Sequence, residues 1–194
     1  AAEKLGIAEP KTVVLPNRAY VDDVTAESLR NLWPVDFSMY LDYVGCPCIM
    51  KPAFGGGWKN VNKIHSLDEL MHHYNDSGTL TLMLQEFISW DTYIRVPTIG
   101  RRWARAIRYD PAPGGMGGYN QDYDILPRAL RDKAEELSLQ YNVALGYDMN
   151  ALEFAVKDGK YYGIDLTNYT PDLDYRSLKD AHFPWAVEKM AAFA

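Results

Sequence analysis

The sequence has few of the residues that usually carry metal, redox or nucleophilic chemistry. Its 194 residues include only two cysteines and four histidines, and these offer no Ser/His/Asp or Cys/His constellation. Cys46 and Cys48 are separated by Pro47 alone. That spacing is too close along a strand for a good disulfide, and one such pair does not complete a zinc site. We interpret both cysteines as packing residues and expect a reducing compartment, the cytoplasm.

The sequence also lacks an excess of positive charge and any long apolar run. Its formal net charge of −6 argues against a general affinity for nucleic acid or anionic membranes. We find no signal peptide, membrane-spanning run, internal repeat or low-complexity tract. With 47% hydrophobic residues, the chain can bury one large core or two small ones. These features are typical of a soluble enzyme core that binds neither nucleic acid nor membrane.

Two segments near the C-terminus each supply a candidate metal-ligating carboxylate. Residues 147–153 and 163–171 predict two strands joined by a hairpin at Asp158-Gly159. The first strand carries Glu153 and the second carries Asp165, with Asn168 shortly after it. Two carboxylates and a carboxamide at the end of a hairpin suit a hard cation that carries phosphates, normally Mg²⁺.

The predicted metal site imposes a condition on this hairpin. Side chains alternate along a strand, so a loop of even length would place Glu153 and Asp165 on opposite faces. We therefore predict the three-residue loop Lys157-Asp158-Gly159, or an equivalent bulge. The alternative is an ordinary exposed hairpin whose acidic side chains are solvated.

A glycine-rich segment follows an earlier strand. Lys51-Pro52 is followed by Gly55, Gly56 and Gly57, and then by a second strand. Consecutive glycines let backbone N–H groups turn towards phosphate oxygens, and Lys51 adds a positive charge at the strand end. The pattern is neither a Walker A loop nor Gly-x-Gly-x-x-Gly. A plain flexible hairpin is the alternative interpretation.

Arginines mark the region between these two motifs. The apolar strand at 82–88 ends in Gln85-Glu86-Phe87-Ile88, and two more strands are predicted at 93–100 and 102–108. Arg95 and Arg108 in these strands suit the recognition of anionic groups. This pair of strands also carries Arg101 and Arg102. For these two arginines, solvated pairing with side chains of the neighbouring strand is the better interpretation.

The remaining predicted elements form the scaffold. They are a strand at 12–15 and helices at 25–32, 36–44, 66–74, 127–141 and 181–193. Thr25 is the expected N-cap of its helix, and Ser66 begins a capping box with Glu69. The glycine-rich segments 55–60 and 110–124 are predicted to be mobile loops.

The order of these motifs resembles the ATP-grasp family of carboxylate–amine ligases, and most of all the branch that includes the ribosomal-protein glutamate ligases. The similarity runs over residues 5–171. The resemblance implies that the glycine-rich loop binds phosphates and that the hairpin holds the metal. It also implies that residues 85–88 are the hinge between two subdomains and that their backbone clamps the adenine. The implied nucleotide contacts are Lys51, Gly55, Gly56, Gly57, Gln85, Glu86, Phe87 and Ile88, the catalytic arginines are Arg95 and Arg108, and the metal ligands are Glu153, Asp165 and Asn168.

The chain departs from the family pattern in its last motif and at the strand arginine. The usual Glu-x-Asn is one residue longer here, running from Asp165 to Asn168. Because the Asn-x-x-Pro spacing to Pro171 is kept, the metal role goes to Asn168 and not to Thr167. Tyr93 replaces the family's Asp before the strand arginine, and Asp91 is the shifted candidate for the ribose contact.

The resemblance also implies an architecture. The expected ATP-grasp fold is α+β, with two α+β subdomains at 12–88 and 89–194 clasping the nucleotide between them. Residues 1–11 are predicted to be the end of a linker helix, capped by Gly6, from an absent N-terminal domain. A phosphate-binding Lys of the family pattern would precede residue 1. We therefore expect this chain on its own to bind ATP weakly and to turn over little.

The implied activity is an ATP-dependent ligation through an acylphosphate. A substrate carboxylate attacks the γ-phosphate, and an amine or thiol then displaces the phosphate. The implied cofactors are ATP and Mg²⁺, with Mn²⁺ as a substitute. Arg108 would steady the transferring phosphoryl group. The partners would be a small-molecule or peptide carboxylate and an amine, which the sequence does not identify. Segments 110–124 and 172–176 are the candidates to contact them, and a solvated loop is the preferred alternative for 172–176.

Two other functions stay open. One is an ATP-binding module without catalysis, like the synapsin-type members of the fold. Tyr93, Trp58 and the shifted Asn168 are the features that favour it. The other is a phosphotransferase that stops at the phosphorylated substrate.

Overall fold

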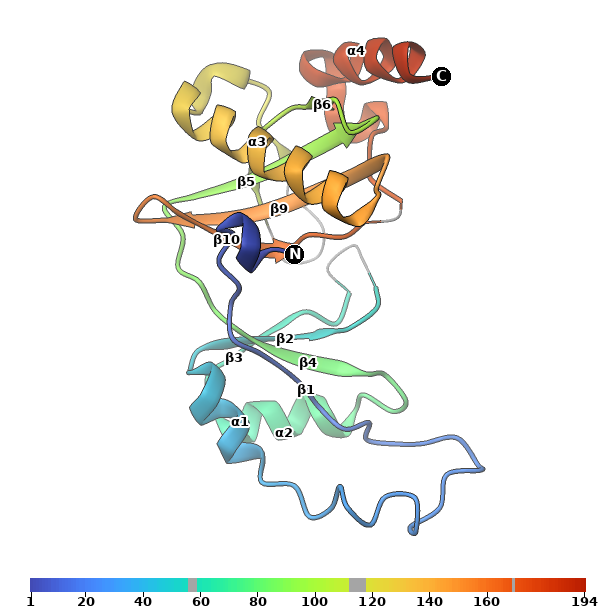
Figure 1. The fold of residues 1–194 in the computed structure, drawn as a ribbon. Coiled ribbons are helices and arrows are strands. Elements are labelled where there is room, and N and C mark those ends of the chain that lie inside the picture. The colour runs from blue at the N-terminus through green and yellow to red at the C-terminus, as the bar shows by residue number, and fades with distance from the viewer. Residues whose placement is uncertain (56–58, 112–117, 169) are drawn as a thin grey trace. The chain divides into compact units, whose positions relative to one another are not determined.

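The chain forms two compact units. The computed structural model describes residues 1–55, 59–111, 118–168 and 170–194. Of these, unit 1 contains 1–9 and the described residues from 88 onward, and unit 2 contains 10–55 and 59–87 (Figure 1). The division therefore falls between residues 87 and 88 in the second half of the predicted hinge. Residues 56–58 of the glycine-rich segment and residues 112–117 of the predicted loop at 110–124 lie outside the described residues.

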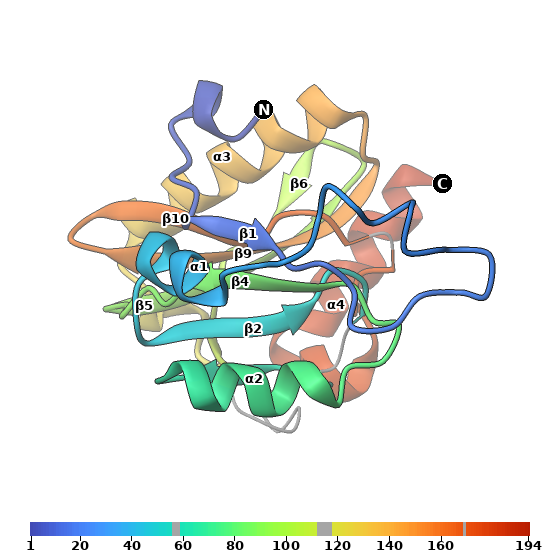
Figure 2. The ribbon, with the colours of Figure 1, turned by 90° about the horizontal axis from the view of Figure 1, so that it is seen from below.

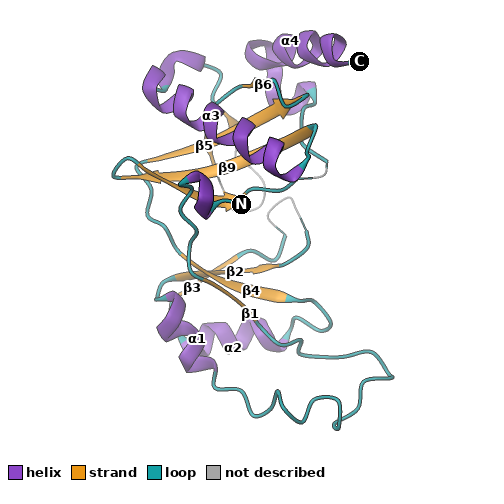
Figure 3. Ribbon diagram, in the orientation of Figure 1, coloured by secondary structure: helices purple, strands orange, loops and turns teal. Residues whose placement is uncertain are grey.

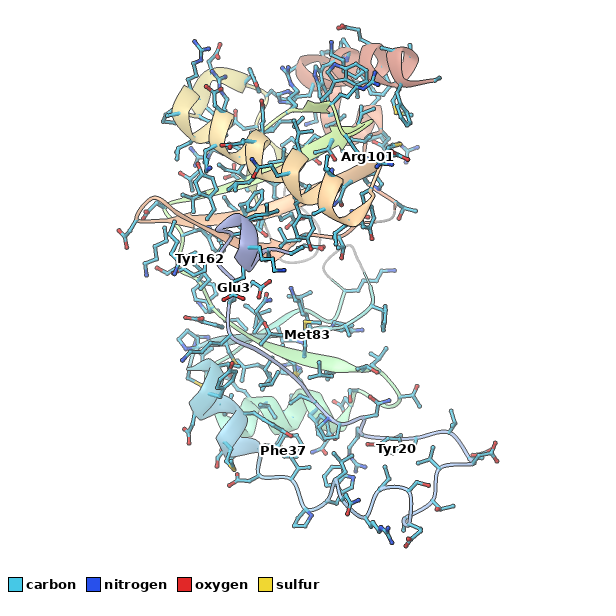
Figure 4. The ribbon with its side chains drawn as sticks, viewed as in Figure 1. Glu3, Tyr20, Phe37, Met83, Arg101 and Tyr162 are labelled. Atoms are coloured by element: carbon cyan, nitrogen blue, oxygen red, sulfur yellow. The ribbon has the colours of Figure 1, made fainter. Side chains whose placement is uncertain are left out.

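Unit 2 is a four-stranded antiparallel sheet with two helices on one face (Figures 1 and 2). Its elements in sheet order are β1 (Thr12–Val14), β4 (Leu82–Glu86), β2 (Cys48–Pro52) and β3 (Asn62–Ile64), with α1 (Phe37–Val44) and α2 (Leu67–Asn75). The core lies between sheet and helices. Phe37, labelled in Figure 4, packs its ring 4.8 Å from that of Tyr74, measured between centroids.

Both helices of unit 2 begin where the sequence predicts. The Asp36 carboxylate accepts a hydrogen bond from Ser38 N and caps α1, which ends at Gly45. Ser66 Oγ accepts from Glu69 N at 3.2 Å and caps α2. Glu69 bonds back to the amide of His65 at 2.7 Å instead of that of Ser66. The capping signals alone therefore set these two boundaries.

The predicted helix at 25–32 is wrong. The segment forms consecutive turns closed by bonds such as Leu29 N to Ala26 O, and it belongs to the long loop between β1 and α1 (Figure 3). Thr25 Oγ1 lies 3.3 Å from Ser28 Oγ and caps no helix. Nearly all of its side chains are exposed. Eight residues without a buried face do not supply enough packing to stabilise a helix.

Unit 1 is built on a larger antiparallel sheet. The strand order is β10-β9-β5-β7-β8, with β6 also paired to β5. The elements are η1 (Glu3–Leu5), β5 (Thr92–Ile99), β6 (Trp103–Ala104), β7 (Ile107–Asp110), β8 (Gly118–Tyr119), η3 (Tyr123–Ile125), α3 (Arg128–Leu145), β9 (Met149–Lys157), β10 (Lys160–Asp165) and α4 (Tyr175–Phe193). Among the residues described, no helix combines the length and the apolarity needed to cross a membrane.

The two faces of this sheet have different partners. Ile94 and Phe154 belong to a core cluster that includes Ala134 and Leu137 of α3. Residues of the opposite parity, such as Tyr93 and Ala155, join a second cluster with Leu178 and Ala186 of α4. Since alternate residues of a strand point to opposite faces, each side chain of β5 and β9 is assigned to one of these two environments by its position.

The single strand predicted at 102–108 is split into β6 and β7. Both pieces keep one register against β5, and the gap between them lies opposite Pro97. Arg105 N donates to Pro97 O, but proline has no N–H with which to return the bond. Ala106 N instead donates to the Glu135 carboxylate at 2.9 Å. The proline in β5 is therefore the reason for the interruption.

Candidate active site

The β9–β10 hairpin turns through two residues, so of the two predicted arrangements the three-residue loop is wrong. Lys157 pairs directly with Lys160, and the turn consists of Asp158 and Gly159. Both have positive φ, 49° and 74°. Two successive left-handed residues are typical of the type I′ turn that Asp-Gly favours.

The other predicted arrangement, an equivalent bulge, is present in β10 and places Glu153 and Asp165 on the same face. The register runs regularly to the pair Gly163 and Phe154, then shifts so that Asp165 lies opposite Glu153. Residues directly opposite each other in an antiparallel pair share a face, with Cβ atoms roughly 4.5–5.5 Å apart. The prediction that Glu153 and Asp165 share a face is confirmed, and the bulge, not the loop, brings it about.

We expect the bulge to depend on the absence of a side chain at Gly163. A Cβ there would lie 2.6, 2.8 and 2.9 Å from three side-chain carbons of Leu166, which packs on the unit 1 core. Gly163→Ala should therefore lower the free energy of unfolding by about 1–3 kcal/mol, measured by chemical denaturation. Gly118→Ala, where nothing lies within 4 Å of the added Cβ, is the control. Equal stability of the two variants would contradict this explanation.

The Glu153 carboxylate is held by two side chains of β5. Tyr93 Oη donates to Glu153 Oε2 at 2.6 Å, and Arg95 Nε lies 3.5 Å from Glu153 Oε1. Tyr93 is 4% exposed, and burial, followed by the charge of Glu153, raises its pKa well above the ordinary value. Tyr93 therefore stays protonated and remains a donor at neutral pH. The residue that departs from the family pattern thus fixes the orientation of a predicted metal ligand.

Tyr93→Phe is expected to lower the free energy of unfolding by about 1.5–3 kcal/mol. It removes the donor to a partly buried carboxylate while keeping the ring, and bonds to charged groups are worth that much. Tyr175→Phe is a matched control, because Tyr175 Oη donates to the Asp180 carboxylate at 2.9 Å with the tyrosine 53% exposed. Thermal or chemical denaturation of both variants gives the comparison. A similar change in each would mean that Tyr93 gains nothing from its buried position.

Arg95 lies among aromatic rings on the same face. Its guanidinium carbon is 5.3 Å from the ring centroid of Tyr109 and 5.4 Å from that of Tyr119. Within the described part of the chain, Arg95 Nε and Tyr119 Oη are buried without a hydrogen-bond partner. Arg95 therefore has donor capacity left beyond its ion pair with Glu153. Arg95 was predicted as a site residue from the sequence, whereas no sequence pattern marked Tyr109 and Tyr119 as its neighbours.

Asn168 follows the hairpin as a half-buried residue. Its backbone N–H donates to Asn150 Oδ1 at 2.8 Å, and its own Oδ1 accepts from Thr170 N at 3.1 Å. Asp165 is exposed. The three predicted metal ligands thus lie on β9, at the end of β10 and in the segment just after it.

The structure does not bring Arg108, the second predicted catalytic arginine, to this group. Arg108 pairs with Ile94, whereas Arg95 pairs with Ile107. Arg108 therefore points to the face opposite Arg95 and Glu153. Its Nε lies 3.6 Å from Asp110 Oδ1, and nearly half of its side chain is exposed. This ion pair joins two residues of β7 and is open to solvent. The catalytic role of Arg108 stays a prediction.

The phosphate-binding residues predicted in unit 2 are described in part. Lys51 lies in β2, half-buried and paired with Met83 of β4. Gly55 is exposed with a φ of 159°, which is extended backbone. Gly56 and Gly57 lie outside the described residues. The assignment of this loop to phosphate binding stays a prediction.

The predicted hinge is ordered by contacts of its side chains. Gln85 Nε2 donates to Thr12 Oγ1 at 3.3 Å, and Glu86 Oε2 accepts from Lys11 N at 3.1 Å. Lys63 Nζ lies 3.7 Å from the centroid of the Phe87 ring. Ile88 is buried in the α4-side core of unit 1. These contacts leave the adenine role of the hinge backbone as a prediction.

Asp91, the predicted ribose contact, bonds to the turn of the β9–β10 hairpin. Its Oδ2 accepts from Asp158 N at 2.9 Å, and its own amide donates to Val156 O. The side chain therefore stabilises the turn of the β9–β10 hairpin. Its contact with the ribose stays a prediction.

The donor set fits a hard divalent cation. Glu153 and Asp165 share one face and Asn168 adds an amide oxygen, all of them oxygen donors of the kind that Mg²⁺ and Mn²⁺ take. Within the described residues, no group of three or more His, Cys, Asp or Glu side chains is arranged for a metal. A site here would therefore hold its ion by two carboxylates and a carboxamide, leaving other positions for phosphate oxygens.

Comparisons with known proteins agree with this arrangement at the level of the fold. No family model matches the sequence. Human mitochondrial pyruvate carboxylase is 26% identical over 140 residues, which cover 64% of this chain and 12% of the carboxylase. The D-alanine–D-alanine ligase of Bacillus anthracis superposes with a TM-score of 0.72 and 17% identity, covering 99% of this chain and 64% of the ligase. The same ligase complexed with ATP gives a TM-score of 0.61.

A second kind of enzyme superposes as well. N5-carboxyaminoimidazole ribonucleotide synthetase of Thermus thermophilus gives a TM-score of 0.57 and 20% identity over 84% of this chain and 41% of the synthetase. These similarities do not decide the branch, so the resemblance to the glutamate ligases stays a prediction. They do decide the architecture: this chain has the ATP-grasp fold, as the order of its motifs predicted.

Proposed function

We propose that this chain is the nucleotide-binding core of an ATP-dependent ligase that joins a carboxylate to an amine. The observation that carries the proposal is the Glu153–Asp165 pair, brought to one sheet face by a bulge within an ATP-grasp fold. The ATP complex of the Bacillus anthracis ligase supports nucleotide binding by the same fold. The chain spans 64% of that ligase and 12% of the carboxylase, so the activity of the whole protein is inferred from these residues and not transferred from its relatives.

Glu153, Asp165 and Asn168 are the residues that would hold the metal. A bound Mg²⁺ or Mn²⁺ would neutralise charge on the ATP phosphates and orient them. Tyr93 keeps the Glu153 carboxylate in place through its 2.6 Å hydrogen bond. The ordered carboxylate costs little further conformational entropy on binding, because its partners are already packed.

Lys51 and Arg95 would contribute the positive charge. Lys51, at the end of β2, would contact the phosphates together with the backbone of the glycine-rich loop. Arg95, with a buried Nε that lacks a hydrogen-bond partner among the described residues, would bind the transferring phosphoryl group in place of Arg108. Its ion pair with Glu153 at 3.5 Å is long enough to rearrange when the metal takes up the carboxylate charge.

The reaction that fits this arrangement has two steps. A substrate carboxylate oxygen bonds to the γ-phosphorus of ATP, the bond from that phosphorus to the β,γ-bridging oxygen breaks, and ADP leaves. The amine nitrogen of the second substrate then attacks the acyl carbon, phosphate leaves, and the nitrogen loses a proton. Nothing in this sequence of steps requires a side-chain nucleophile, in keeping with a chain that offers no such constellation. A reducing cytoplasm is the compartment we propose, because Cys46 and Cys48 are free.

The complete gene product, incubated with ATP, Mg²⁺ and panels of small carboxylates, peptides and amines, tests the proposal. We expect ADP release that depends on one carboxylate and one amine, and a product whose mass is their sum less one water. A phosphorylated carboxylate as the only product would identify a phosphotransferase. ATP binding without ADP release for any pair would identify a non-catalytic module.

A further inference from the structure

Asn150 is a buried side chain with a complete set of hydrogen bonds. It is the second residue of β9 and is 0% exposed. Its Nδ2 donates to Asn142 Oδ1 at 2.9 Å and to Leu166 O at 2.8 Å, and its Oδ1 accepts from Ala151 N at 2.9 Å and from Asn168 N at 2.8 Å. A carboxamide can make two donor and two acceptor bonds, so every one is used.

The partners of Asn150 leave only one orientation for its amide. Reversing the group would place the NH₂ against the N–H groups of Ala151 and Asn168, and the oxygen against the carbonyl oxygens of Leu166 and Asn142. Both contacts would be repulsive. The four partners therefore fix which side of the Asn150 carboxamide donates and which side accepts.

Two of these bonds fasten the segment that follows Asp165. Leu166 offers its carbonyl and Asn168 its amide to the same side chain, while Thr167 between them is exposed. The residue that lengthens the motif from Glu-x-Asn to Asp-x-x-Asn thus lies between two backbone groups that both bond to Asn150.

We propose that Asn150 is the positioning residue that makes Asn168, and not Thr167, the third ligand of the metal. The proposal rests on the proposed function, because it assigns a role within that metal site. Asn150 touches no substrate. It acts by setting where the backbone of Asn168 lies relative to Asp165.

The anchor behind Asn150 is rigid. Asn142 of α3 donates to Thr98 Oγ1 at 2.6 Å, and Thr98 of β5 donates to the carbonyl of Asn150 at 3.1 Å. All three residues are 0% exposed. Such a buried polar network favours a single arrangement, because a lost bond would leave a buried group unsatisfied. The 166–168 segment is therefore tied to both the sheet and α3.

Amide hydrogen exchange measured by NMR tests the positioning without any nucleotide. In the parent chain the Asn168 N–H should be protected, although it lies in a loop. Asn150→Ala should speed its exchange by at least about tenfold. Asn142→Ala is the matched control, since it disturbs the same buried network but leaves both bonds from Asn150 to the segment. Unchanged Asn168 exchange in Asn150→Ala, or the same acceleration in Asn142→Ala, would overturn the positioning role.

ATP binding with Mg²⁺ and with EDTA then tests the ligand assignment. Loss of a residue that orients a metal ligand typically costs 10- to 100-fold in metal affinity. We expect Asn150→Ala and Asn168→Ala each to lose about tenfold or more of the Mg²⁺-dependent gain, with ATP binding in EDTA unchanged. Thr167→Ala should keep the full gain. A loss in Thr167→Ala with none in Asn168→Ala overturns the proposal, and both of these variants replace residues that are not fully buried, so they remain informative if Asn150→Ala fails to fold.

Failure of the proposed function has a different signature. A parent chain whose ATP affinity is the same in Mg²⁺ and in EDTA would remove the metal site and, with it, the ligand role of Asn168. Exchange at Asn168 would still report whether Asn150 fixes the segment. The two results therefore separate an error about Asn150 from an error about the activity.

Discussion

Glu153→Gln is expected to remove the Mg²⁺-dependent part of ATP binding, a loss of at least about 100-fold in affinity for the metal–nucleotide complex. Loss of a residue that only orients a metal ligand typically lowers metal affinity by about 10- to 100-fold. Loss of a direct carboxylate ligand should lower it further. The glutamine keeps the shape and can still accept the bond from Tyr93. Affinity for ATP in EDTA should stay within about twofold, so that calorimetry in the two buffers isolates the metal term.

The control for this variant is a carboxylate elsewhere on unit 1. Asp148→Asn removes an exposed carboxylate that pairs with Arg101 at 2.7 Å, just before β9. It changes the net charge by the same amount as Glu153→Gln and should leave both affinities unchanged. Equal losses in the two variants would show that general electrostatics, and not a site at Glu153, determine the Mg²⁺ dependence.

Lys51→Ala is expected to lower ATP affinity by about 1.5–3 kcal/mol, roughly 10- to 150-fold. A charge-assisted contact with a phosphate is worth that much, and the binding that remains should fall below detection if the parent binds weakly. Unlike the effect of Glu153→Gln, this loss should appear in EDTA as well as in Mg²⁺, because in the proposed site Lys51 would contact the phosphates directly.

Lys59→Ala gives the comparison for Lys51. Lys59 is exposed beyond the glycine-rich loop, and its removal changes the net charge equally. Calorimetry should find it close to the parent. If both lysine variants bind ATP as the parent does, Lys51 is not a phosphate ligand and the glycine-rich segment is only a turn.

The parts of the site that local sequence rules determine were predictable. Asp158-Gly159 marks the hairpin, and Ser66 and Asp36 mark helix starts, because each acts on residues close in the chain. That Glu153 and Asp165 share a face was predictable only as a requirement of the predicted metal site. Nothing in the sequence separates a two-residue loop with a bulge from a three-residue loop, since the decision depends on how Leu166 packs over Gly163.

The parts that depend on distant residues were not predictable. Tyr93 and Glu153 are 60 residues apart, and their hydrogen bond requires the β5–β9 register. No sequence pattern marked Asn142 and Asn150 as buried. Asparagines are usually exposed, and these two are buried because their side chains hydrogen-bond to each other. The face on which Arg108 lies was not predictable either, because the alternation of faces along β7 is fixed by its pairing with β5, not by its own residues.

Crystals of the chain grown with Mn²⁺ and a non-hydrolysable ATP analogue would test the central claim most directly. Anomalous scattering locates Mn²⁺ without reference to the surrounding density. We predict a peak bonded to carboxylate oxygens of both Glu153 and Asp165, at ligand distances of about 2.1–2.2 Å. A peak that contacts only one of these carboxylates, or that lies elsewhere on the protein while the analogue is bound, would contradict the account.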